Sequence, residues 1–123
     1  MFETTVAPRQ KTLDAAPARE PDAYEALIAE IGEDGAAEVR DVFWSETRAR
    51  LQLFRTLTLA DQLARIVREA HSLKSSAGTF GYVRLAALAL RLETSADTLA
   101  EAEFHDLLDR MDAAFDAARA QEP

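Results

Sequence analysis

Residues 58–81 read TLADQLARIVREAHSLKSSAGTFG, and the helix that this stretch predicts is the strongest indication of the fold. Thr58 and Asp61 stand three residues apart, which is the spacing of a capping box at a helix N-terminus. Apolar side chains then recur alternately four and three residues apart, at Leu59, Leu63, Ile66, Ala70, Leu73, Ala77 and Phe80. A stripe of this kind, held for about three heptads, is typical of a helix that packs in a bundle. We therefore predict an α-helix that ends between Gly78 and Gly81.

Two helices are predicted on the N-terminal side of this one. Asp22 and Glu25 form another capping-box pair ahead of a short stripe, which Gly32 ends; the stripe contains Tyr24, Leu27, Ile28 and Ile31. Asp34 can cap a longer second helix. Its apolar positions are less regular and comprise Val39, Val42, Phe43, Leu53, Phe54 and Leu57.

Two more helices follow on the C-terminal side. Residues 82–96 are apolar on more than one side of a helix, so we expect them deep in the bundle; the apolar positions are Val83, Leu85, Leu88, Leu90 and Leu92. Asp97 or Thr98 can cap the last helix, whose stripe contains Phe104, Leu107, Leu108, Met111, Phe115 and Ala118. No period-two alternation points to a strand. We predict an all-α fold, an antiparallel four-helix bundle with a short additional N-terminal helix.

Composition narrows the class of protein. The 123 residues are 48% hydrophobic, which suits one domain with one core. The net charge of -8 argues against nucleic acid or an anionic membrane as the partner. The chain has no cysteine, so disulfides, thiolate metal sites and a cysteine nucleophile are excluded. The charged surface favours a monomer.

The chain is expected to comprise a flexible tail over residues 1–21 and a helical domain over residues 22–121. Three of the four prolines lie in that tail, which shows no periodic apolar pattern. The N-terminus lacks the basic start and apolar run of a signal peptide. The longest apolar run, residues 85–90, is far shorter than the ~20 residues of a membrane-spanning helix. A cytoplasmic protein is the expectation.

His71 is the residue in the bundle with the clearest chemical potential. On the helical wheel it stands roughly 120° from the centre of the apolar stripe, with Lys74 about 60° to one side. A neutral imidazole is a nucleophile at physiological pH, and a nearby ammonium can hold phosphoryl oxygens. Attack through Nε2 requires a carboxylate or carbonyl that holds the proton on Nδ1. Spacing alone leaves a second interpretation open, an ordinary surface or interface histidine.

The run AHSLKSSAGTFGY at residues 70–82 resembles the phosphoacceptor helix of histidine-containing phosphotransfer (HPt) domains. It is especially similar to the N-terminal phosphotransfer domain of chemotaxis histidine kinases. The similarity extends through Leu90-Arg91-Leu92-Glu93 and, by helix count, over about residues 22–121. It implies a four-helix bundle that carries a phosphoryl group in a two-component phosphorelay. No kinase or receptor-coupling segment follows, so we expect a stand-alone phosphocarrier without kinase activity.

The resemblance assigns roles to individual residues. It implies that His71 is phosphorylated on Nε2, that Lys74 stabilises the phosphoryl group, and that Glu93 accepts a hydrogen bond from Nδ1 and orients the ring. Ser75 replaces the glycine that usually follows the lysine. Serine is still small, so we expect activity to survive, but the larger side chain affects how closely a partner can approach and hence the transfer rate. The resemblance implies no cofactor and no metal in this bundle, since the receiver brings Mg²⁺. Gly81 matches a family glycine that permits a tight turn.

The implied partners are the receiver domain of a response regulator, a sensor histidine kinase, or both. We expect them to dock on the flank around His71, on Ala64, Val67, Arg68, Ser75 and Gly78. Val67 is the most informative of these, because packing inside the chain does not require an apolar side chain at its wheel position. Substituting Val67→Asp is expected to weaken receiver binding and to leave the melting temperature nearly unchanged.

Two other classes of function stay open at this point. One is an interaction module that keeps the bundle and binds a receiver or kinase without transferring a phosphoryl group. The other is a structural bundle, which predicts a large exposed apolar patch and a stable oligomer. The second histidine, His105, lies beside Phe104 and Asp106 with no lysine three residues later, and we interpret it as structural or solvated. The spacing around His71 and His105 offers no closed metal site.

Overall fold

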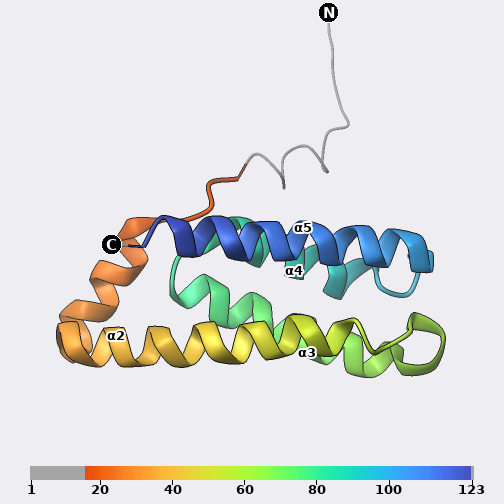
Figure 1. Cartoon of the computed structure of the whole chain (residues 1–123), viewed down its shortest axis with the longest axis horizontal. Helices are drawn as coiled ribbons and strands as arrows, with labels where there is room; N and C mark the ends of the chain where they lie inside the picture. The colour runs from red at the N-terminus through yellow and green to blue at the C-terminus, as the bar shows by residue number, and fades with distance from the viewer. Residues whose placement is uncertain (1–15, 123) are drawn as a thin grey trace, which may run out of the picture.

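The computed structural model describes residues 16–122, and its helices are α2 (Pro21–Phe54), α3 (Leu59–Thr79), α4 (Val83–Ser95) and α5 (Glu101–Ala120). Short connections join them, so that successive helices run in opposite directions (Figure 1). No residue between 16 and 122 lies in a β-strand. The prediction of an all-α antiparallel bundle is confirmed.

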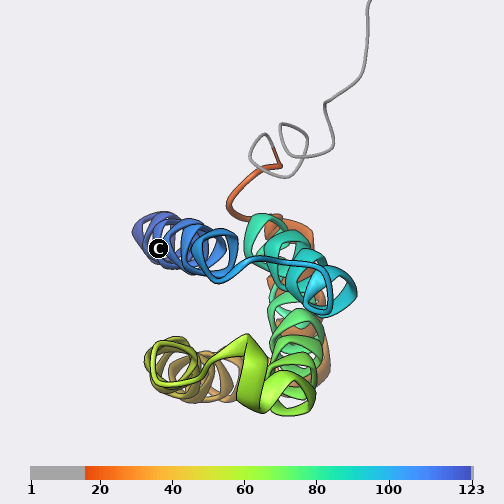
Figure 2. The ribbon, with the colours of Figure 1, turned by 90° about the vertical axis from the view of Figure 1, so that its right-hand side faces the viewer.

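The four helices are arranged around one core. Each helix packs against the next along the chain, and α5 returns to α2; the pairing of α3 with α4 is the most extensive. The end-on view in Figure 2 shows this order. The stripe predicted for α3 faces inward, with Ile66, Ala70 and Leu73 fully buried. The whole stripe predicted for α5 is buried as well. These two stripes therefore supply much of the core.

Helix α2 consists of two helical segments that meet at Gly32, where φ is 83° and ψ is 167°. The left-handed φ is open to glycine and unfavourable for other residues, which explains why the short leading helix ends there, as predicted. Tyr24 in the leading segment is buried against the core. The second segment differs from prediction, because Val39 and Val42 are exposed. Its buried positions are Ala36, Phe43, Trp44, Thr47, Leu51 and Phe54, which define a different face of the helix.

The predicted start of α3 is confirmed by its cap. Thr58 Oγ1 accepts a hydrogen bond from the backbone N–H of Asp61 at 3.3 Å and donates one to the Asp61 carboxylate at 3.1 Å. The cap predicted at Asp22 is wrong, because α2 begins at Pro21 and has no side-chain cap. A proline in the first turn has no N–H to satisfy, which lowers the need for a capping side chain.

The cap predicted for the last helix is also wrong. Helix α5 begins after Ala100, whose backbone N–H donates to Glu103 at 2.8 Å. Residues 96–99 instead form an extra turn, in which the N–H groups of Thr98 and Leu99 donate to the Ser95 carbonyl at 2.9 and 3.1 Å. These bonds extend the last turn of α4, so Asp97 and Thr98 lie at the end of that helix and not at the start of α5.

Residues 16–20 lie along the turn between α3 and α4. The Glu20 N–H donates to the Gly81 carbonyl at 2.6 Å, and the Arg84 N–H donates to the Pro17 carbonyl at 3.1 Å. Ala18 is buried. These backbone bonds differ from the prediction of a flexible tail as far as residue 21. Residues 1–15 of that predicted tail lie outside the described residues.

Glu122 joins the two ends of the domain. Its carboxylate forms salt bridges with Arg19 at 3.1 Å and Arg40 at 2.8 Å, and it accepts a hydrogen bond from the Tyr82 hydroxyl at 2.5 Å. Burial and this hydrogen bond raise the pKa of Tyr82 far above its usual range, so the phenol stays a donor. The Glu122 carboxylate therefore links four parts of the fold, namely the segment before α2, α2 itself, the start of α4 and the end of α5.

Candidate functional site

His71, Lys74 and Glu93 come together on the flank shared by α3 and α4. His71 Nδ1 lies 2.7 Å from Glu93 Oε2, and Lys74 Nζ lies 3.3 Å from Glu93 Oε1. The His71 side chain is 58% exposed, whereas that of Glu93 is only 20% exposed. The Glu93 carboxylate therefore contacts both His71 and Lys74 at the less exposed side of the site, and the His71 ring is exposed to solvent.

The packing of α3 against α4 creates this arrangement. Leu73 on α3 and Leu92 on α4 are fully buried, and this sets the rotation of each helix about its axis. With those rotations, His71 and Glu93 emerge on the same flank. Lys74 follows His71 by three residues, so it lies beside the ring one turn further on. The contact that the resemblance implied between Glu93 and Nδ1 of His71 is present.

The charge of Glu93 determines which ring nitrogen of His71 carries the proton. The hydrogen bond with His71 lowers the pKa of Glu93; desolvation opposes this shift, and the interaction with Lys74 adds to it. The Glu93 carboxylate is therefore ionised at neutral pH and can only accept hydrogen bonds. Its partner Nδ1 must carry a proton. In neutral His71 this leaves the lone pair on Nε2, the ring nitrogen opposite the carboxylate.

The surface around His71 is built from small and exposed side chains. Ala64, Arg68, Ser75 and Gly78 are all exposed, and a Cβ placed on Gly78 would meet no atom within 4 Å. Val67 differs from expectation, because it is partly buried and packs against the core. Packing does use this side chain, so a Val67→Asp substitution would also cost stability. That variant cannot separate docking from folding.

Leu90 is a residue of this surface that sequence reasoning misplaced. The even spread of apolar residues around α4 predicts it deep in the bundle, yet it is 43% exposed. Leu90 lies one turn before Glu93, within about 60° of it on the α4 wheel, and so on the flank that faces His71. Its i, i+3 relation to Glu93 is the signal that could have placed it there.

The other polar features of the domain lie away from this flank. His105 is exposed on α5, in agreement with a solvated residue. Among residues 16–122 no three His, Asp or Glu side chains gather closely enough to hold a metal ion. None of the helices in this range combines the length and apolarity that a bilayer crossing demands.

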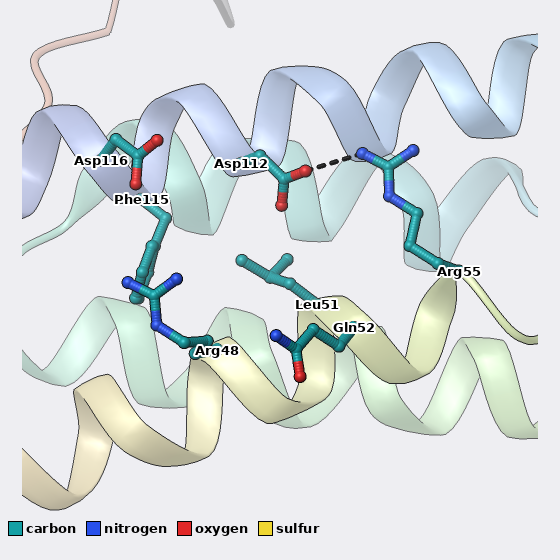
Figure 3. Close-up of a pocket in the computed structure, with 7 residues that line it drawn as sticks. All are labelled: Arg48, Leu51, Gln52, Arg55, Asp112, Phe115 and Asp116. Atoms are coloured by element: carbon teal, nitrogen blue, oxygen red, sulfur yellow. Dashed lines mark hydrogen bonds and ion pairs between the residues drawn. The ribbon is translucent and has the colours of Figure 1, made fainter.

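A groove of about 340 Å³ lies between α2 and α5, on the side of the bundle opposite α3 and α4 (Figure 3). It is lined by Arg48, Leu51, Gln52, Arg55, Asp112, Phe115 and Asp116. Arg55 donates to Asp109 at 2.8 Å and to Asp112 at 2.7 Å. The Arg48 guanidinium lies over the Phe115 ring, 5.1 Å from its centroid. Both arginines of the groove thus contact side chains of the domain, and neither histidine lines the groove.

An oriented, solvent-facing imidazole on an antiparallel helical bundle is an arrangement that suits a carrier of a transferred group. Comparison with known families agrees, because the family model of the Hpt domain matches residues 38–121. The chain belongs to the Hpt domain family. Membership in this family points to a phosphocarrier rather than a kinase.

Two individual relatives are phosphorelay proteins. The chain is 34% identical over 70 residues to the phosphorelay protein LuxU of Vibrio vulnificus strain YJ016 and, equally, of strain CMCP6. Each match covers 57% of this chain and 61% of the relative, so the chain spans about three fifths of the length of these curated relatives. No solved structure gives a significant match.

Proposed function

We propose that the chain is a histidine phosphocarrier of a two-component phosphorelay, with residues 22–121 as its carrier domain. His71 accepts a phosphoryl group from a receiver aspartate or a histidine kinase and passes it to another receiver aspartate. The protein acts in the cytoplasm as a monomer and has no kinase activity of its own. The observation that carries the proposal is the exposed His71 ring held at Nδ1 by Glu93.

The transfer step follows from the state of the ring. The Nε2 lone pair attacks the phosphorus of an aspartyl phosphate; the Nε2–P bond forms as the P–O bond to aspartate breaks, and the aspartate leaves as a carboxylate. The proton on Nδ1 stays in place, so the phosphorylated ring becomes cationic. The Glu93 carboxylate at 2.7 Å stabilises that charge. Return of the phosphoryl group to an aspartate reverses each change.

Lys74 supplies the second electrostatic contribution. Its ammonium pairs with Glu93 Oε1 at 3.3 Å in the unphosphorylated protein, and its side chain is 32% exposed. Lysine carries its charge on a flexible stem with three donors. It can therefore turn from the carboxylate to the phosphoryl oxygens when these arrive, without any movement of the backbone.

Phosphorylation can be measured directly. The protein is incubated with a phosphorylated receiver domain, and separately with phosphoramidate, and its intact mass is recorded. We expect one added phosphoryl group, which mild acid removes because a P–N bond is acid-labile. A folded protein that gains no mass from either donor would contradict the proposal and would favour an interaction module that does not transfer.

Substituting Glu93→Gln is expected to slow phosphotransfer by at least about tenfold, since replacing a carboxylate that orients a reacting histidine by its amide disturbs the tautomer of the ring. The amide still fits, but it no longer balances the charge of the phosphorylated ring. Nitrogen-15 NMR of the His71 ring provides the readout that a purely structural role would not change. The wild type should show the Nδ1–H form, and the variant a mixture of tautomers. An unchanged tautomer with an unchanged rate would exclude a positioning role for Glu93.

Gly78→Ala tests the docking surface without damage to the fold. An alanine within the helix should stabilise the protein by about 0.5–1 kcal/mol, since nothing lies within 4 Å of the added methyl group. The same methyl group stands on the flank where a receiver must approach. We expect a higher melting temperature, slower transfer from a receiver, and an unchanged rate with phosphoramidate. Equal receiver rates would place docking elsewhere.

A further inference from the structure

The middle of α2 exposes apolar side chains that the core does not use. Four large hydrophobic residues of the described chain are strongly exposed, and three of them lie here: Ile31 at 46%, Val39 at 44% and Val42 at 53%. The phosphotransfer site explains only the fourth, Leu90. The proposed function assigns no role to the outer face of α2.

These side chains are neighbours on one face. A Cβ on Gly35 would lie 3.4 Å from Ile31 Cγ1, so the Ile31 side chain lies next to Gly35. Gly35, Val39 and Val42 follow one another at i, i+4 and i+7, which places them on one face over about 10 Å of helix. We call Ile31, Gly35, Val39 and Val42 the α2 stripe.

The surroundings of the α2 stripe are acidic. Between residues 30 and 46 there are six acidic residues, all of them exposed: Glu30, Glu33, Asp34, Glu38, Asp41 and Glu46. None of the six forms a salt bridge within the part of the chain that the structure describes. The one basic residue in this range, Arg40, is engaged by Glu122 and by the Tyr24 ring. An apolar stripe thus lies in an uncompensated negative field.

We infer that the α2 stripe is a docking surface for a basic amphipathic helix of a partner protein. Apolar side chains at i, i+3 or i+4, and i+7 of such a helix would cover the stripe, and flanking Lys or Arg would face the six carboxylates. A second copy of this chain is disfavoured, because a two-fold contact through this face would bring like charges together. The stripe is on α2, whereas His71 faces the α3–α4 flank. A partner held here leaves His71 free to react.

The test uses the full chain and a synthetic 18-residue peptide of leucine and lysine, with leucine at helical spacing. Two control peptides have the same composition in scrambled order, or glutamate in place of lysine. Amide NMR titrations should place the largest shifts at residues 30–46 for the first peptide alone. Binding should weaken as salt is raised, because salt screens the carboxylates.

Two matched variants isolate the surface. Val42→Lys is expected to weaken peptide binding at least tenfold, whereas Leu90→Lys, at a residue of similar exposure, should leave it unchanged. Shifts centred on His71, or equal affinity for the Val42→Lys variant and wild type, would overturn the inference. So would a dimer of the free chain in sedimentation that Val42→Lys dissolves, because it would make a second copy the occupant. Val42→Lys should keep full phosphoryl uptake from phosphoramidate, so the two proposals can fail separately.

Discussion

Replacing His71 with glutamine should abolish phosphoryl uptake from both a phosphorylated receiver and phosphoramidate. Glutamine is close in size to histidine and polar, so an exposed helix position tolerates it. Its amide has no nucleophilic lone pair comparable to that of Nε2, so no P–N bond can form. The intact mass should therefore stay at the unmodified value, while the far-UV circular dichroism matches that of the wild type.

The second histidine provides a matched control for this experiment. His105 is exposed on α5, and its ring contact within residues 16–122 is with the neighbouring Phe104. His105→Gln should keep the full mass gain and its acid lability. A mass gain that survives in His71→Gln and disappears in His105→Gln would assign the phosphoacceptor to the other histidine and would refute the mechanism.

Gly81→Ala should produce the largest loss of stability among the glycine substitutions. Gly81 has φ of 78°, and a Cβ there would overlap the Glu20 carbonyl oxygen and crowd the Ala23 side chain. Left-handed strain alone costs an alanine about 1–2 kcal/mol. The overlap must also displace residues 16–20, which are hydrogen-bonded to this turn. We expect a total loss of about 3 kcal/mol in urea denaturation.

Gly32→Ala separates the two parts of that loss. Gly32 has a similar φ of 83°, but nothing lies within 4 Å of the position that an added methyl group would occupy. Gly32 has ψ of 167°, in a φ/ψ region that is almost exclusive to glycine, so this variant should lose the backbone strain alone, about 1–3 kcal/mol. A loss in Gly81→Ala that is no larger than the loss in Gly32→Ala would contradict the expected cost of displacing residues 16–20.

The sequence predicts a helix and its buried face correctly where the cap and the apolar period agree. Thr58 and the stripe of α3 agree in cap and period, and both predictions are confirmed. The apolar pattern of α2 is irregular, and it wrongly places Val39 and Val42 in the core, although Trp44, Thr47 and Leu51 define the buried face. The prediction for Leu90 fails for the opposite reason, since α4 is apolar nearly all round and its exposed side could not be told from its buried one.

The segment before α2 shows a limit of a different kind. Residues 16–20 carry no periodic pattern. They are held by backbone bonds to Gly81 and Arg84, by a hydrogen bond from Arg84 Nε to the Ala16 carbonyl at 2.7 Å, and by the salt bridge of Arg19 with Glu122. The backbone bonds do not depend on side-chain identity, and the side-chain bonds join residues far apart in the chain, so composition could not reveal either kind. The same applies to Glu122, whose partners Arg19, Arg40 and Tyr82 lie far apart in the chain.

By itself, the sequence determined the helical class and the pair His71 and Lys74, because helical period and i, i+3 spacing are local properties of the chain. The antiparallel order follows from the short connections between the helices. Local spacing could not place the contact of Glu93 with Nδ1, 22 residues away on another helix; the family resemblance implied it, and the tertiary structure forms it. That contact depends on how far α3 and α4 are rotated toward each other. The rotation is set by the packing of the whole core, which no local pattern contains.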